Sequence, residues 1–333
     1  MIHALLDSAP LWAWLGFHGL VFVMLALDLG VFNRRIHAPS YREAAVWSAV
    51  WIGLALVFNG AVFLGYFAPP NAVHYDAGIK ATEWFTAYVL EKSLSVDNLF
   101  VFVMLFAAFG VEMKNQHRIL YWGILGALIM RAVMILAGTA LLNRFEWMMY
   151  VFGAFLIYTG IKMFFVEEAG ADPTKNGIVR VFRKIMPFDP EGGHQHFLVK
   201  KNHRLYATPM LLVLISVEVT DLIFAVDSIP AVLAITRDPF VVYTSNIFAI
   251  LGLRSLYFLL AKMMDRFHRL KIGLAVILTF VGIKMCAAHW LKTSLGISDQ
   301  TLIITSLVFI SSVLAGSIIA SLAWPAEHPG EKP

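Results

Sequence analysis

The segments EKSLSVDN (residues 91–98) and EVTDLIFAVDS (residues 218–228) decide the fold, because each carries carboxylates inside an apolar run. The two runs, at about residues 83–109 and 208–236, are each long enough to cross a bilayer. A carboxylate at the bilayer centre costs at least about 2.5–3.5 kcal/mol. The two segments therefore predict an interior sheltered from lipid, in which acidic side chains face a cavity or bind cations.

The composition around these segments is typical of a membrane protein. Of 333 residues, 59% are hydrophobic and 14% are charged, with a mean hydropathy of +0.73. A soluble domain is about half apolar and a quarter charged. The single cysteine, Cys286, excludes a disulfide framework and a cysteine-rich metal site. The net charge of +4 does not indicate nucleic-acid binding, because the basic residues lie in loops between apolar runs.

Nine apolar runs predict an all-α polytopic membrane protein with about nine transmembrane helices in a single membrane domain, residues 1–333. The first run has no basic stretch ahead of it, which favours a span over a cleaved signal peptide. The predicted spans are 11–32, 44–67, 83–109, 118–142, 147–166, 208–236, 243–264, 271–291 and 301–323. The chain divides into two N-terminal spans (1–82), a three-helix unit (83–166), a cytoplasmic loop (167–207), a second three-helix unit (208–291) and a last span with its tail (292–333).

Loop charge predicts the orientation. With nine spans, seventeen Lys and Arg residues fall on one side of the membrane and four on the other. Basic residues concentrate on the cytoplasmic side. We therefore expect the N-terminus outside and the C-terminus in the cytoplasm.

The two three-helix units resemble each other. In each, an acid is followed six residues later by Asp-Asn or Asp-Ser, then by an arginine one helix on, then by Gly-Ile-Lys-Met at 160–163 or 282–285. An odd number of spans per unit makes the second unit enter the membrane from the opposite side. The sequence thus predicts an inverted repeat, a design that places the site of a secondary transporter near the midplane.

The acids are the candidate metal-handling residues. Carboxylate, amide and hydroxyl oxygens favour hard cations, and the absence of His and Cys from the two segments argues against zinc or copper. Clustered carboxylates also offer exchangeable protons. The five acids of the two segments are the predicted metal ligands, and Ser95 and Asp28 are weaker candidates: Glu91, Asp97, Glu218, Asp221 and Asp227.

Helix geometry limits how these acids meet. Glu91 and Asp97 are six residues apart, about 120° around an ideal helix. One ion could bind all five acids only if the helices unwound near 93–95 and near 224–225, and Pro230 favours such a break. The alternative is that some acids are counter-ions of Arg131 and Arg254, which lie at membrane depth.

The same two motifs resemble the signatures of the TerC/Alx family of integral membrane proteins, and residues 246–257 resemble its third marked segment. The resemblance runs from about Phe17 to Trp290. It implies export of Mn²⁺ as a transported substrate from the bacterial cytoplasm, through a protein of the inner membrane. It further implies metal-handling roles for the five acids, and auxiliary oxygen ligands from Asn98, Ser228 and Asn246.

Other functions stay open at this level. The same acids would serve a monovalent cation/proton antiporter acting in alkaline conditions, and a non-transporting membrane subunit linked to tellurium resistance is a further alternative. An enzyme is not expected, since neither a His-Glu-x-x-His helix nor a serine motif with a membrane-depth histidine occurs. We expect no catalytic residue, no resident cofactor and no nucleic-acid partner.

Overall fold

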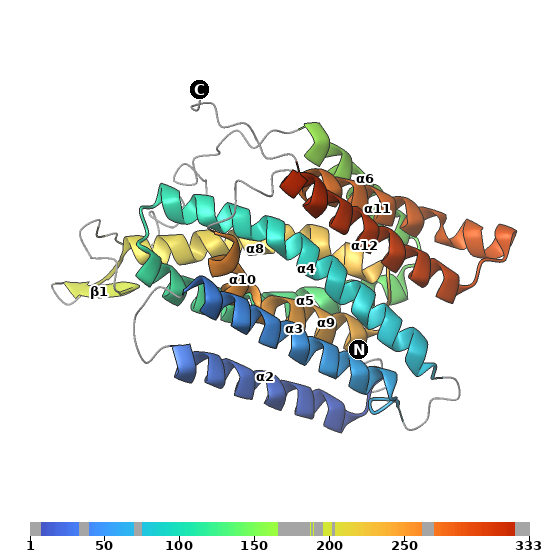
Figure 1. Ribbon diagram of the computed structural model, residues 1–333, viewed down its shortest axis with the longest axis horizontal. Helices are drawn as coiled ribbons and strands as arrows, with labels where there is room; N and C mark the ends of the chain where they lie inside the picture. The colour runs from blue at the N-terminus through green and yellow to red at the C-terminus, as the bar shows by residue number, and fades with distance from the viewer. Residues whose placement is uncertain are drawn as a thin grey trace.

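The computed structural model describes residues 8–32, 40–69, 75–165, 187, 189, 196–201, 204–261 and 270–323, which form a nearly all-helical chain (Figure 1). The N-terminal half contains α2 (Leu11–Phe32), α3 (Tyr41–Phe63), α4 (Ala77–Ala108), α5 (Met113–Arg144) and α6 (Met148–Phe165). The C-terminal half contains α8 (Pro209–Leu233), α9 (Pro239–Leu251), α10 (Leu253–Leu260), α11 (Leu270–Leu295) and α12 (Asp299–Ala323).

Each predicted span coincides with one helix or, for 243–264, with the pair α9 and α10. By length and composition, six of the described helices could cross a membrane: α3, α5, α6, α8, α11 and α12. The bent pair α9–α10 would make a seventh. The helix α4 is long but carries Glu83, Glu91, Lys92 and Asp97 along its length. The chain is thus a polytopic membrane protein with six or seven candidate spans.

The surface of these helices is apolar. Phe165 is 81% exposed, Val57 is 73% exposed and Phe22 is 72% exposed, and each lies on a helix. Large apolar side chains that point outward from a helix bundle are typical of contact with lipid.

Helix ends follow local sequence signals. The side chains of Asp76, Thr208 and Asp238 accept hydrogen bonds from backbone N–H groups at the starts of α4, α8 and α9. Such caps satisfy donors that a helix start leaves unpaired. Proline follows Thr208 and Asp238 directly, and the first turn of a helix tolerates it.

The expected unwinding of two spans is not found. Both α4 and α8 are continuous through 93–95 and 224–225, and α8 continues past Pro230 to Leu233. Pro230 lies only three residues before the end of α8, where losing one backbone bond matters little. The break falls instead at Gly252, where α9 and α10 meet at 42°.

Lys92 of α4 stabilises this break. Its ammonium donates to the Ala249 carbonyl at 3.1 Å, near the C-terminus of α9, where the helix dipole favours a cation. A Cβ atom at Gly252 would lie 2.8 Å from the Lys92 Nζ and 3.1 Å from the Trp51 Cβ. Glycine is therefore required at the bend by the closeness of its neighbours.

The hydrophobic core has two parts. One part joins α2, α3 and α9 to α4 through rings such as Phe58, Trp84 and Phe248, and the Trp84 indole donates to Thr244 at 2.9 Å. The other part lies among α6, α8, α11 and α12. The helix pairs α6–α11, α5–α8 and α4–α9 form the main contacts between elements.

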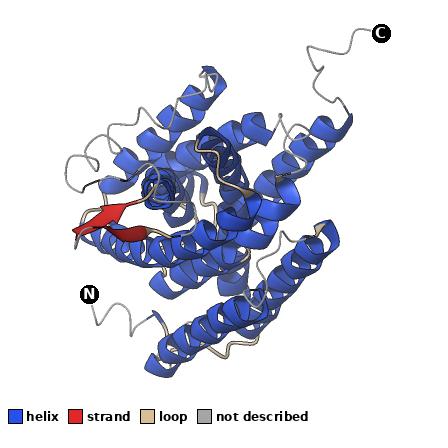
Figure 2. Cartoon of the chain, turned by 90° about the vertical axis from the view of Figure 1, so that its left-hand side faces the viewer, coloured by secondary structure: helices blue, strands red, loops and turns tan. Residues whose placement is uncertain are grey.

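A short hairpin that the sequence did not predict lies in the long loop. Strands β1 (Leu198–Lys201) and β2 (Arg204–Ala207) pair antiparallel, with Leu198 opposite Ala207. The hairpin projects at one end of the helices in Figure 1 and faces the viewer in Figure 2. Most of the loop at 167–207 lies outside the described residues.

Close contact between α6 and α11 generates a stability prediction. A Cβ atom at Gly282 would lie 2.7 Å from the Gly153 carbonyl oxygen, so the Gly282→Ala variant should push the two helices apart. We expect a loss of about 1–3 kcal/mol, the usual cost of overpacking. Thermal unfolding in detergent measures it, and Gly316→Ala, where nothing lies within 4 Å, is the matched control. Equal unfolding midpoints for the two variants would contradict the close contact between α6 and α11 at Gly282.

Candidate ion site

Arg131 of α5 is the centre of a buried ionic cluster. The side chain is 0% exposed, and its Nη2 donates to the Asp221 carboxylate at 3.0 Å. The Nε donates to the other Asp221 oxygen at 3.3 Å, and Nη1 donates to Glu91. The Asn246 side-chain oxygen also accepts from Nη1, at 3.4 Å. The cluster therefore joins α4, α5, α8 and α9.

The cluster carries more negative than positive charge. Two carboxylates, Glu91 and Asp221, face one guanidinium, so one negative charge is left over when both acids are ionised. Within the described part of the chain, the second Glu91 oxygen and the Asn246 amide nitrogen are buried without a hydrogen-bond partner. A buried surplus charge is costly, and a proton or a second cation would remove it.

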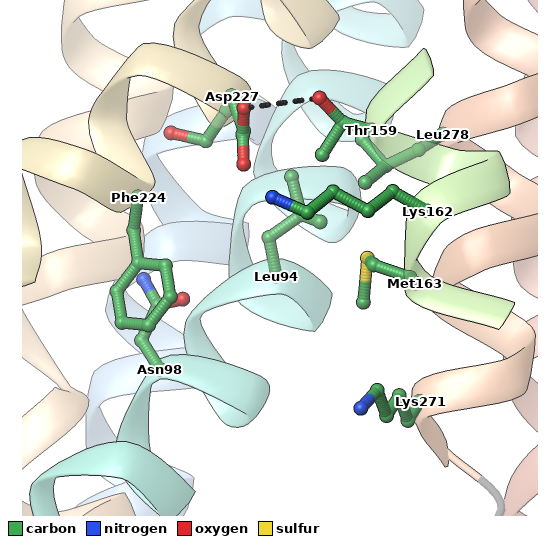
Figure 3. A pocket seen from close by; sticks show the side chains of 10 residues that line it. Leu94, Asn98, Thr159, Lys162, Met163, Phe224, Asp227, Lys271 and Leu278 are labelled. Atoms are coloured by element: carbon green, nitrogen blue, oxygen red, sulfur yellow. Dashed lines mark hydrogen bonds between the residues drawn. The ribbon is translucent and has the colours of Figure 1, made fainter. Parts of the chain in front are cut away.

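A separate cavity of about 220 Å³ opens beside Asp227 (Figure 3). The Thr159 hydroxyl of α6 donates to the Asp227 carboxylate at 3.4 Å. Lys162, also on α6, extends across the cavity toward Asp227. Asn98 and Ser228 line the same cavity, which places carboxylate, hydroxyl and amide oxygens around one space.

The hydroxyls near this cavity have unused hydrogen-bonding capacity. Ser228 is 1% exposed and Ser95 is 0% exposed. Neither hydroxyl oxygen has a hydrogen-bond partner among the residues that the structure describes. A buried hydroxyl without a partner costs free energy, so a ligand or water at this position would satisfy it.

The remaining predicted residues lie elsewhere. Glu218 packs against α5, where a Cβ atom at Gly126 would overlap its carboxylate. Arg254 of α10 is 3% exposed and shares a small apolar cavity with Asp221. The side chains of Asp28 and Asp97 lie outside the described part of the chain.

The five acids do not converge on one point in the described structure. Glu91 and Asp221 meet at Arg131, Asp227 lies in its own cavity, and Glu218 faces Gly126. Among the side chains that are described, no three of the His, Cys, Asp and Glu residues come close enough to hold a metal ion together. The continuous helices are the reason, because six residues on one helix separate two side chains by about 120°.

Two cavity residues were not among the sequence candidates. Thr159 and Lys162 are three residues apart on α6 and so share one face of that helix. The repeat offered a signal, since Lys162 belongs to the Gly-Ile-Lys-Met segment that recurs at 282–285.

The fold and the site define a polytopic helical membrane protein with ionisable side chains buried between its helices. Residues 77–328 match the family described as integral membrane protein TerC family. The chain belongs to this family.

Relatives cover nearly the whole chain. A membrane protein of Myxococcus xanthus is 46% identical over 93% of this chain and 91% of its own length. A Salmonella typhi protein named "Putative membrane-bound redox modulator Alx" is 49% identical over 86% of this chain and 88% of its own. An Escherichia coli K12 protein of the same name is 46% identical over 89% and 93%. No solved structure matches the chain.

The arginine cluster generates a second stability prediction. Replacing Arg131 by Gln would leave Glu91 and Asp221 buried without a counter-ion, and breaking a buried ion pair in this way costs about 3–5 kcal/mol. We expect a large fall in the thermal unfolding midpoint of the purified protein. Arg144→Gln, on an exposed residue of the same helix, is the control. Adding Asp221→Asn to Arg131→Gln should recover part of the loss, and a further additive loss would argue against the pairing.

Proposed function

We propose that this chain transports a divalent cation, with Mn²⁺ exported from the cytoplasm as the substrate. The Asp227 cavity carries the proposal. Its polar lining includes a carboxylate, two hydroxyls and an amide beside Lys162 and Lys271, and no His or Cys is among the described residues that line it. Mn²⁺ and Mg²⁺ favour such oxygen ligands. Asp227, Thr159, Asn98 and Ser228 are the proposed ligands, and Asp97 is the candidate to complete them from α4.

An inverted repeat is part of the proposal, and contacts between α6 and α11 support it. A Cβ atom at Gly160 would meet Thr279, and one at Gly282 would meet Ile157. The shift along the chain that relates Gly160 to Gly282 also relates Ile157 to Thr279. Each contact is therefore the symmetry equivalent of the other, as a two-fold axis between α6 and α11 requires.

The arginine cluster supports the same axis. Glu91 and Asp221 occupy equivalent positions in the two units, and both bind the single guanidinium of Arg131. The helix pairs α4–α9 and α5–α8 are likewise equivalent when the units are exchanged. Together with α2, α3 and α12, two such three-helix units give the nine spans of the proposed topology.

The extra negative charge of the arginine cluster offers a way to couple cation transport to proton transport. Protonation of the Glu91–Arg131–Asp221 cluster would neutralise its extra negative charge, and so would a passing cation. Exchange between the two is the chemistry of a proton-coupled antiporter. We propose that this cluster carries the proton and that the Asp227 cavity carries the metal.

The proposed setting is the bacterial inner membrane, with the N-terminus outside and the C-terminus in the cytoplasm. The excess of Lys and Arg in the loops on one side supports this orientation. The Asp227 cavity then opens toward the cytoplasm, because Lys271 in its lining follows directly on the basic loop at 262–269.

Flux of Mn²⁺ into proteoliposomes tests the function. Asp227→Asn removes the carboxylate charge of the cavity with little change in volume, so we expect a fall in flux of at least about tenfold, since hydrogen bonds and ion contacts to a charged group contribute about 1.5–3 kcal/mol. Glu112→Gln, on an exposed acid at the start of α5 that lines neither cavity, should transport like the unaltered protein.

Three outcomes separate the candidate functions. Normal Mn²⁺ flux in the Asp227→Asn variant would mean that the metal binds at another site. Proton movement driven by Na⁺ or K⁺ in the absence of Mn²⁺ would favour the monovalent cation antiporter. A redox role, as the name of the Alx relatives states for those proteins, could not use an intrachain disulfide here, because the chain has one cysteine.

A further inference from the structure

A second polar cavity, of about 650 Å³, lies at the opposite ends of the same helices. It is lined by the start of α4, the start of α6, the end of α8 and the later turns of α11. Glu83 of α4 is its most buried carboxylate, with a side chain 12% exposed. Lys80 and Thr236 both donate to one Glu83 oxygen, Oε2, at 3.1 and 2.8 Å. The other oxygen, Oε1, takes no hydrogen bond from the described residues and remains open to a ligand.

The sequence repeat relates this Glu83 cavity to the Asp227 cavity. Lys162 and Met163 line the Asp227 cavity, and their equivalents Lys284 and Met285 line the Glu83 cavity. The relation therefore holds for a pair of residues on α6 and the matching pair on α11. An inverted repeat would place two such cavities at opposite faces of the membrane.

An apolar layer separates the two cavities. Ile229 and Val232 of α8 lie between Asp227 and Thr236, and each is no more than 3% exposed. Leu278 and Val281 of α11 are equally buried and belong to the same hydrophobic cluster. Ser228 lines the Asp227 cavity and Leu233 lines the Glu83 cavity, and the five residues from one to the other correspond to roughly 8 Å along a helix. A closed barrier of this kind is what keeps the two ends of a transport path apart.

Each cavity also contains the lysine of the repeated Gly-Ile-Lys-Met segment. Lys162, exposed at the open cavity, extends toward Asp227 in Figure 3. Lys284 is 9% exposed, lines the Glu83 cavity and donates to the Ala234 carbonyl at 3.4 Å. A buried ammonium without a close carboxylate contact is costly, so Lys284 is held where a cation is needed.

We propose that the Glu83 cavity is the outer compartment of the cation path and that the Asp227 cavity is its cytoplasmic compartment. Lys284 is the internal cation of the outer compartment, and Lys162 is that of the cytoplasmic compartment. Each ammonium supplies a positive charge to its cavity when the cavity is empty, and a transported cation displaces it. The proposal rests on the cation transport proposed above. It adds Glu83 and Lys284 to the path, and it makes each lysine act on one face of the membrane.

The test measures the Mn²⁺ concentration for half-maximal flux from each face, in everted and in right-side-out membrane vesicles. Removing a competing positive charge strengthens cation binding. Lys284→Met should therefore lower the half-maximal concentration about tenfold from the outer face only. Lys162→Met should lower it similarly from the cytoplasmic face only. Arg144→Met, on an exposed cation at the end of α5 that lines neither cavity, is the matched control and should change neither value.

Further variants keep the outcomes separate. Lys284→Arg retains the charge and should behave like the unaltered protein, while Glu83→Gln should raise the half-maximal concentration from the outer face. Thermal unfolding of each purified variant identifies misfolding, and Lys284→Gln replaces the Met variant if that one unfolds. Equal effects on both faces, or none, with normal transport by the unaltered protein would overturn the proposal. Absence of any Mn²⁺ flux in the unaltered protein would instead refute the proposed function, and the proposal with it.

Discussion

A guanidinium cut off from water is the constraint on which the centre of this protein depends. Arg131 is fully buried in α5, and it donates hydrogen bonds to acids on α4 and α8 and to an amide oxygen on α9. Removing an arginine from water is expensive unless its donors are satisfied by well-placed acceptors. Four helices must therefore approach one another at a single point.

Small residues set the second constraint. Where α6 and α11 cross, Gly153, Gly160 and Gly282 let the two backbones approach within contact distance. Small residues at helix crossings are a general device of membrane proteins, because lipid offers no hydrophobic force to hold helices together. This crossing holds two helices whose lysines face the two different cavities, so its stiffness bears on how the cavities open and close.

Much of the architecture could be predicted from the sequence, because hydropathy and helix length are local properties. All nine apolar runs coincide with helical elements, and the membership of the TerC family follows the two acidic motifs. The meeting of five acids at one ion could not be predicted correctly. Spacing along a chain does not show whether a helix stays intact. Both α4 and α8 stay intact, and the described acids Glu91, Asp221 and Asp227 lie at two separate places.

Contacts between helices could not be predicted from the sequence either. Lys162 was known only as part of a repeated segment, whereas the structure directs it over a cavity toward Asp227. The hairpin at 198–207 has too few residues for a clear alternating pattern, and the Gly252 bend depends on Lys92 and Trp51, which are far from it in sequence. Partners of this kind become visible only when the chain is folded.

The neighbours Glu91 and Lys92 have a mechanical consequence for α4. Successive residues point about 100° apart on a helix, and here one is tied to Arg131 of α5 while the other is tied to the end of α9. Because these two contacts leave α4 in different directions, they block rotation of the helix about its own axis, although they still permit it to tilt. Any rearrangement of this protein that moves α4 must therefore carry α5 and α9 along as one body, or else break a charged contact that has no water to replace it.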